Sequence, residues 1–141
     1  MLKKSICAVC AILMFAAPVF AGTFTDNGDG TVTDADTALM WQQLDVIDKT
    51  WQEALDYCNA LDHADFIDWR VPNIKELESI VDETVFNPAI DGIYFPGTYS
   101  SYYWSSTPST LNTDNAWVVV FDDGYVYDYL KTSANNVRCV R

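Results

Sequence analysis

Positive charge is scarce in this chain. Its 141 residues include 8 Lys and Arg against 20 Asp and Glu, which gives a formal net charge of −12 at pH 7. Nucleic acids, anionic lipids and anionic glycans bind to clustered cations, so this balance argues against all three as partners. Solubility accounts for the acidity, and an acidic binding face is the alternative.

Long hydrophobic runs are also missing. The apolar run Ile6–Phe15 is about half the length that a membrane-spanning helix needs, roughly 20 residues. Two lysines precede it, and the small residues Val19 and Ala21 suit a signal peptidase. We predict that residues 1–21 are a cleaved signal peptide and that residues 22–141 form one domain, secreted, periplasmic or at the cell surface. Loss of both lysines takes the net charge to −14.

Cysteine is sparse, with four in the chain. Cys7 and Cys10 lie inside the apolar run rather than at its end, so a lipid anchor is less favoured than simple cleavage. Cys58 and Cys139 would reach an oxidising compartment, where one disulfide is the simplest account of the pair. Two free thiols or a metal site with two cysteines are the alternatives, although His63 is the only histidine.

The sequence pattern predicts strands around two helices, which indicates an α+β domain with an antiparallel sheet. Asn-Gly and Asp-Gly at residues 27–30 supply the turn of an N-terminal hairpin. A capping box at residues 50–53 starts a helix that continues to Leu61. Asn73 caps a second helix, expected to extend to Val81. Later strands are predicted at residues 103–106, 116–121, 125–130 and 137–141.

A long structured loop is predicted at residues 82–103, where proline and glycine separate isolated apolar residues. Loops of this length are uncommon in small domains and tend to be functional. Packing of its aromatic residues against the body of the domain explains the pattern equally well.

Tyrosine, serine and asparagine are frequent from the end of this loop onward. They combine rigid amphipathic contact area with adaptable hydrogen bonds, and aromatic faces stack on sugar rings. Tyr125, Tyr127 and Tyr129 are equally explained as one face of a strand, and most tryptophans as core residues. We predict a ligand-binding surface made of Tyr99, Tyr102, Trp104, Asn112, Asp114, Asn115, Tyr125 and Tyr127.

Catalytic and metal-binding patterns are weak. His63 has no serine or cysteine nucleophile in a recognisable setting, so we expect no enzymatic activity. No cofactor is expected. Calcium is the alternative, held at residues 27–30 or by Asp114, Asp122 and Asp123, but turn formation accounts for these residues.

Several ordered motifs over nearly the whole chain after the leader resemble the Lcl C-terminal-domain family. In chain order they are Asp26-Asn27-Gly28-Asp29-Gly30-Thr31-Val32-Thr33-Asp34, Leu39-Met40-Trp41-Gln42, Trp51-Gln52-Glu53-Ala54, Asp68-Trp69-Arg70-Val71-Pro72-Asn73, Tyr103-Trp104-Ser105-Ser106 and Val137-Arg138-Cys139-Val140-Arg141. The family is similar to C-type-lectin-like domains. The resemblance implies two helices with an antiparallel sheet and a long loop, and a disulfide between Cys58 and Cys139.

The resemblance places the ligand at the long loop and the late strands. The sequence departs from calcium-dependent lectins, whose long loop carries Glu-Pro-Asn or Gln-Pro-Asp, because its one similar triplet is Val71-Pro72-Asn73 before the second helix. The sulfated polysaccharide bound by the family's namesake is not expected at a net charge of −14. We expect an exported binding or adhesion module for a polysaccharide or protein, with a structural subunit of the envelope or an enzyme as alternatives.

Overall fold

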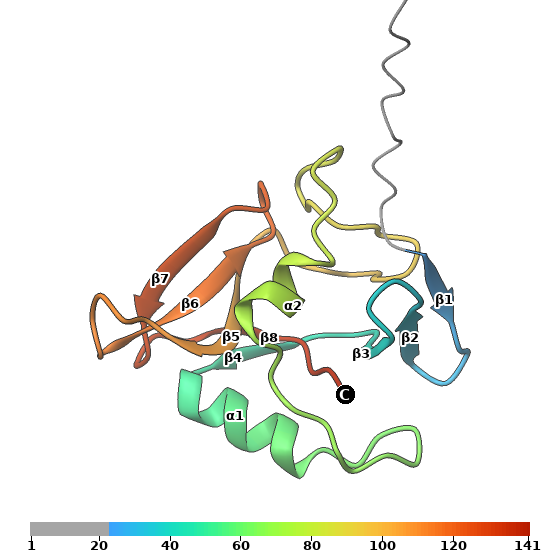
Figure 1. The fold of residues 1–141 in the computed structure, drawn as a ribbon, viewed down its shortest axis with the longest axis horizontal. Helices are drawn as coiled ribbons and strands as arrows, with labels where there is room; N and C mark the ends of the chain where they lie inside the picture. The colour runs from blue at the N-terminus through green and yellow to red at the C-terminus, as the bar shows by residue number, and fades with distance from the viewer. Residues whose placement is uncertain (1–22) are drawn as a thin grey trace, which may run out of the picture.

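The computed structural model describes residues 23–141, and the predicted signal peptide and cleavage site lie outside them. Within this range the chain forms eight strands and two helices, so the predicted α+β class is confirmed (Figure 1). No helix in residues 23–141 is long and apolar enough to cross a membrane.

The first three strands form a small antiparallel sheet: β1 (Phe24–Asp26), β2 (Thr31–Asp34) and β3 (Leu39–Gln42). In the turn between β1 and β2, the Asp29 carboxylate accepts hydrogen bonds from the backbone N–H and the hydroxyl of Thr31. The predicted hairpin is therefore confirmed. Asp29, which a calcium loop would use as a ligand, forms hydrogen bonds within the turn.

A mixed five-stranded sheet forms the rest of the β structure. Its order is β4 (Val46–Lys49), β8 (Asn135–Val137), β5 (Tyr102–Pro108), β6 (Asn115–Val120) and β7 (Val126–Leu130). The predicted antiparallel pairing is confirmed for every neighbouring pair of strands but one, since β8 lies parallel to β5. Strand β8 follows β7 in the chain but takes its place in the sheet between β4 and β5, in the same direction as β5.

Both helices begin where their capping residues predict. Helix α1 (Trp51–Ala60) starts after the Thr50 capping box and buries Ala54 and Cys58. Helix α2 (Ile74–Glu78) starts after Asn73, but it ends before Ile80 and Val81, which we expected inside it. The chain turns there into the long loop, and Ile80 is buried all the same. The Cys58–Cys139 disulfide joins α1 to the segment after β8, as the resemblance implied.

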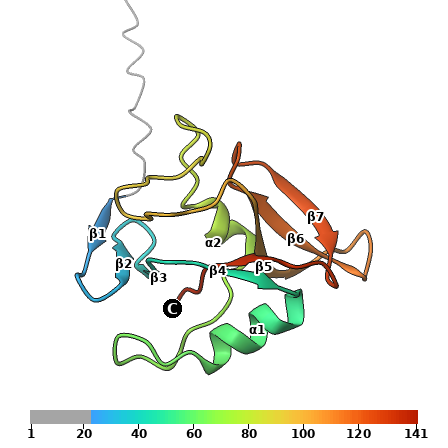
Figure 2. The same cartoon turned by 180° about the vertical axis from the view of Figure 1, so that it is seen from behind.

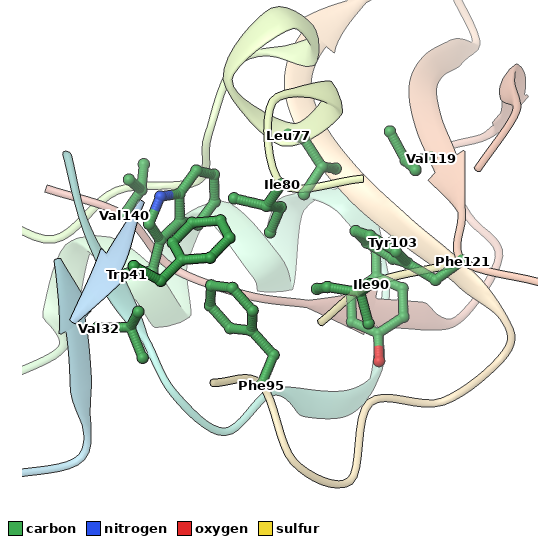
Figure 3. Packing of buried hydrophobic residues seen from close by; sticks show 11 residues of the cluster. Val32, Trp41, Leu77, Ile80, Ile90, Phe95, Tyr103, Val119, Phe121 and Val140 are labelled. Atoms are coloured by element: carbon green, nitrogen blue, oxygen red, sulfur yellow. The ribbon is translucent and has the colours of Figure 1, made fainter. Parts of the chain in front are cut away.

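The core consists of two clusters of buried side chains. The first lies between the N-terminal sheet, α2 and the long loop, and includes Trp41, Leu77 and Phe95 (Figure 3). The second surrounds the disulfide and includes Trp69 and Trp104. The long loop therefore packs Ile90 and Phe95 against the body of the protein, whereas Phe86 and Ile93 are exposed. Figure 2 shows α1 on the opposite side of the five-stranded sheet from this loop.

Candidate functional site

Three tyrosines of the β7 segment are exposed on one face of the five-stranded sheet. Tyr125 keeps 64% of its surface accessible, Tyr127 50% and Tyr129 38%. In the register of β6 with β7, Tyr127 lies opposite Val118 and Tyr129 opposite Ala116. Residues opposite one another in a sheet project from the same face. The tyrosines at every second position of the sequence therefore lie on the exposed face of a strand.

Tyr102 of β5 belongs to the same face. It lies opposite Val120 on β6, and its ring packs on Tyr129 with centroids 4.8 Å apart and the planes tilted by 31°. We call Tyr102, Tyr125, Tyr127 and Tyr129 the tyrosine face. The four side chains give the sheet an amphipathic surface of ring faces and hydroxyl groups, without a cation among them.

Trp104 does not take part in this surface, contrary to the sequence prediction. It is fully buried, and its indole N–H donates a hydrogen bond of 2.8 Å to the Lys49 carbonyl. Trp104 shares a face with Tyr127, since both lie opposite Val118. The reason for its burial is that α1 and the disulfide cover this part of the face.

Asn112, Asp114 and Asn115 lie in and after the connection between β5 and β6. Asn112 and Asp114 are exposed, and the Asp114 N–H donates to the Asn112 side chain. Asn115 is partly buried and donates to Asp128, on the opposite face of the sheet from the tyrosines. The predicted set is therefore divided: these polar residues occupy the far end of the β6–β7 hairpin and the other face of its strands.

Tyr99 lines a separate hollow. This hollow has a volume of about 200 Å³ and forms where the end of the long loop meets β4 and β8. Its lining residues are Ile47, Asp48, Tyr99, Ser101 and Asn136. Our prediction missed the β4 residues. The sequence around Ile47 has one short alternation of apolar and charged residues and no turn signal that would mark a strand.

A larger hollow, of about 430 Å³, adjoins the tyrosine face at Tyr125. Glu83 of the long loop and Asp123 and Gly124 of the β6–β7 turn complete its lining. Two backbone hydrogen bonds fix the loop to the turn: the Asn87 N–H donates to the Asp122 carbonyl at 2.9 Å, and Ala89 donates to Phe121 at 2.7 Å. The sequence does not indicate Glu83, because the loop is held against the turn by backbone hydrogen bonds, which depend little on residue type.

A buried polar network holds the end of the long loop in place. The Tyr103 hydroxyl donates to Asp45 and accepts from the Tyr99 N–H, and the Arg138 guanidinium donates to Thr98 at 2.8 Å. Burial raises the pKa of the Tyr103 hydroxyl, and the hydrogen bond to Asp45 raises it further. Burial lowers the pKa of Arg138. These groups are positioned to support Tyr99 rather than to react.

Histidine and carboxylate groups have structural roles. The His63 Nε2 lies 3.1 Å from the Gly30 carbonyl oxygen and its ring packs on Trp69, so this ring buttresses the β1–β2 turn. Asp123 accepts the Tyr125 N–H inside its turn. Within residues 23–141, no group of three or more His, Cys, Asp or Glu side chains is placed to hold a metal ion.

Comparison with known proteins identifies a family. A search of curated proteins found no match to the chain. A family model described as the Lcl C-terminal domain matches residues 30–141, which contain both helices and every strand after β1. The tyrosine face, both hollows and the disulfide lie inside this match. The chain therefore belongs to the Lcl C-terminal domain family.

Proposed function

We propose that this protein is a secreted, non-enzymatic binding or adhesion module that recognises a polysaccharide or protein ligand. The tyrosine face is the observation that carries the proposal. Tyr125 and Tyr127 keep half or more of their surface exposed to solvent. Trp104, on the same face of the sheet as Tyr127, is instead buried under α1. Exposed aromatic residues gathered on one face are typical of surfaces that bind sugars or proteins.

The long loop packs on the other side of the sheet and meets the tyrosine face only at its end, beside the β6–β7 turn. There Glu83 and Tyr125 line one hollow, whose position is fixed by the backbone hydrogen bonds between loop and turn. A ligand that stacks on Tyr125 and Tyr127 could place a polar group in this hollow. Binding would cost little ordering, because the loop is already packed into the core through Ile90 and Phe95.

Export is supported by the disulfide. Cys58 and Cys139 are both fully buried and bonded, and structural disulfides persist in oxidising compartments. Together with the predicted signal peptide, this favours the periplasm, the cell surface or the medium. The bond from the first helix to the segment after the last strand, and the long loop between α2 and β5, also support a C-type-lectin-like fold.

The proposal is tested with two exposed tyrosines and one matched control. Tyr125→Ala and Tyr127→Ala are expected to weaken binding on a glycan array, or capture of a protein from an envelope extract, by about tenfold each. Ile67→Ala is the control, because Ile67 is exposed at least as much as the two tyrosines but lies in the segment between α1 and α2. Binding that is unchanged in both tyrosine variants, with their melting temperatures unchanged, would refute the proposed surface.

A further inference from the structure

Strand β7 is an edge of the five-stranded sheet. It pairs with β6 on one side, and the strand order places no strand on the other. In Figures 1 and 2 no helix or other strand lies beyond it. An edge strand presents backbone N–H and C=O groups that another chain can pair with.

The hydrogen-bond pattern identifies these groups. The Tyr125 carbonyl accepts from the Val120 N–H, and the Lys131 N–H donates to the Asp114 carbonyl, so odd-numbered residues of this segment direct their backbone towards β6. Backbone direction alternates along a strand in an antiparallel pair. The N–H groups of Val126, Asp128 and Leu130 therefore point away from the sheet.

The usual protection of an edge is weak in β7. The strand contains no proline or lysine, and its register with β6 is regular from Val126 to Leu130. The lysine that follows, Lys131, turns back: its ammonium donates to the Thr113 carbonyl at 2.7 Å and lies 4.6 Å from the centre of the Trp51 ring. The one charge inside the strand is the carboxylate of Asp128.

Charge determines what kind of strand fits this edge. Residues 76–130, which include the long loop and β5 to β7, contain nine Asp and Glu and no Lys, Arg or His. Asp128 accepts hydrogen bonds from Ser109 and Asn115, both at Oδ2, while Oδ1 accepts none within the described residues. A lysine or arginine on an added strand could donate to the Asp128 Oδ1, and residues 76–130 contain no other cation that would compete for it.

A second copy of the chain is the poorer occupant. The antiparallel register that pairs β7 along its full length sets Val126 against Leu130 of the copy and Asp128 directly opposite itself. Like charges opposite one another in a sheet are destabilising. The net charge of −12 on each chain adds a repulsion at longer range.

We propose that β7 binds an extended, basic segment of a partner protein, which adds to the sheet as a sixth strand. The inference rests on the proposed binding function and selects a protein as its partner. Tyr127 and Tyr129, on the exposed face, would flank the added strand's side chains, and Asp128 would pair with a cation on the other face.

The test uses a synthetic seven-residue peptide of alternating lysine and valine, blocked at both ends, and amide hydrogen exchange measured by NMR. At millimolar peptide in low salt, the amides of Val126 and Asp128 are expected to exchange at least about tenfold more slowly than in the free protein. The amides of Tyr127 and Tyr129 bond to β6 and should be protected in both states. A peptide N-methylated at every residue keeps its charge but has no backbone donor on either edge, so it should protect nothing.

Two variants of an exposed position complete the design. Leu130→Pro removes one outward N–H and is expected to weaken peptide binding about fivefold or more, whereas Leu130→Ala keeps that donor and should bind nearly as the parent does. Absence of peptide binding, unchanged exchange at Val126 and Asp128, or equal binding of the N-methylated peptide would overturn strand addition. Protection of these amides without peptide, rising with protein concentration, would instead identify a second copy as the occupant.

These outcomes are separate from the test of the proposed function. Ligand binding that is lost in Tyr127→Ala, with no protection of the edge amides by any ligand or peptide, would retain the tyrosine face and reject the added strand. Failure of both measurements would reject both proposals.

Discussion

Reduction of the Cys58–Cys139 disulfide is expected to lower the free energy of unfolding by about 4.5 kcal/mol. The bond spans 81 residues of chain. In the chain-entropy model, a closed loop of that length removes about 15 cal/mol/K from the unfolded chain, which is about 4.5 kcal/mol at 25 °C. Both cysteines are fully buried among apolar side chains, and reduction removes none of these side chains from the cluster. Most of the loss therefore arises from the greater freedom of the unfolded state.

This loss is large compared with ordinary stabilities. Folded proteins of this size unfold with about 5–15 kcal/mol, so reduction would remove a third of the stability or more. For about 120 residues the unfolding entropy is about 250 cal/mol/K, so the melting temperature should fall by about 18 °C. The reduced protein would then retain between about 0.5 and 10 kcal/mol of stability.

The assay is a urea titration followed by tryptophan fluorescence, since Trp41, Trp69 and Trp104 are all buried. Oxidised and reduced samples are compared under the same conditions. The double variant Cys58→Ala with Cys139→Ala is the control, because it should resemble the reduced protein and not respond to reductant. A difference between oxidised and reduced protein below about 1 kcal/mol would refute the loop-entropy reasoning.

Three further predictions concern a turn, an ion pair and calcium. Gly124→Ala should cost about 3 kcal/mol, because φ is +83° and the new Cβ would lie 2.5 Å from Val81 Cγ1, whereas Gly92→Ala, with open space around it, should be nearly neutral in the same urea titration. The hydrogen bond from Arg70 lowers the pKa of Glu76, so its stabilisation is present above the unfolded pKa of about 4.3 and is lost as pH falls through the folded value; Glu76→Gln should flatten the decline in stability measured below pH 5. Calcium chloride and chelator should give the same melting temperature, and a rise of several degrees with calcium would contradict this.

Local signals predicted the helix starts well. Thr50 with Glu53, and Asn73 with Glu76, form their reciprocal hydrogen bonds within four consecutive residues, so the sequence alone contains the whole interaction. The end of α2 could not be found in this way. Ile80 continues the helical spacing, but it reaches the core from a turn whose direction depends on the long loop.

Contacts between distant segments explain the remaining errors. Trp104 and Tyr127 lie on one face of the sheet, and only the position of α1 decides that the first is buried and the second exposed. The parallel pairing of β5 with β8 depends on a crossing that no local pattern encodes. The hollow at Tyr99 likewise needs β4, a short strand whose partner β8 lies almost ninety residues further along the chain.

The central position of β8 has a consequence for the order in which the molecule can form. A chain that emerges N-terminus first, from a ribosome or a translocation pore, exposes β4, β5, β6 and β7 before residues 135–137 are available to join them. Until then β4 and β5 have no hydrogen-bonded partner between them, and Cys58 has no Cys139 to meet. The five-stranded sheet therefore closes last at its middle, and the same C-terminal stretch of chain supplies both the missing strand and the second cysteine of the disulfide.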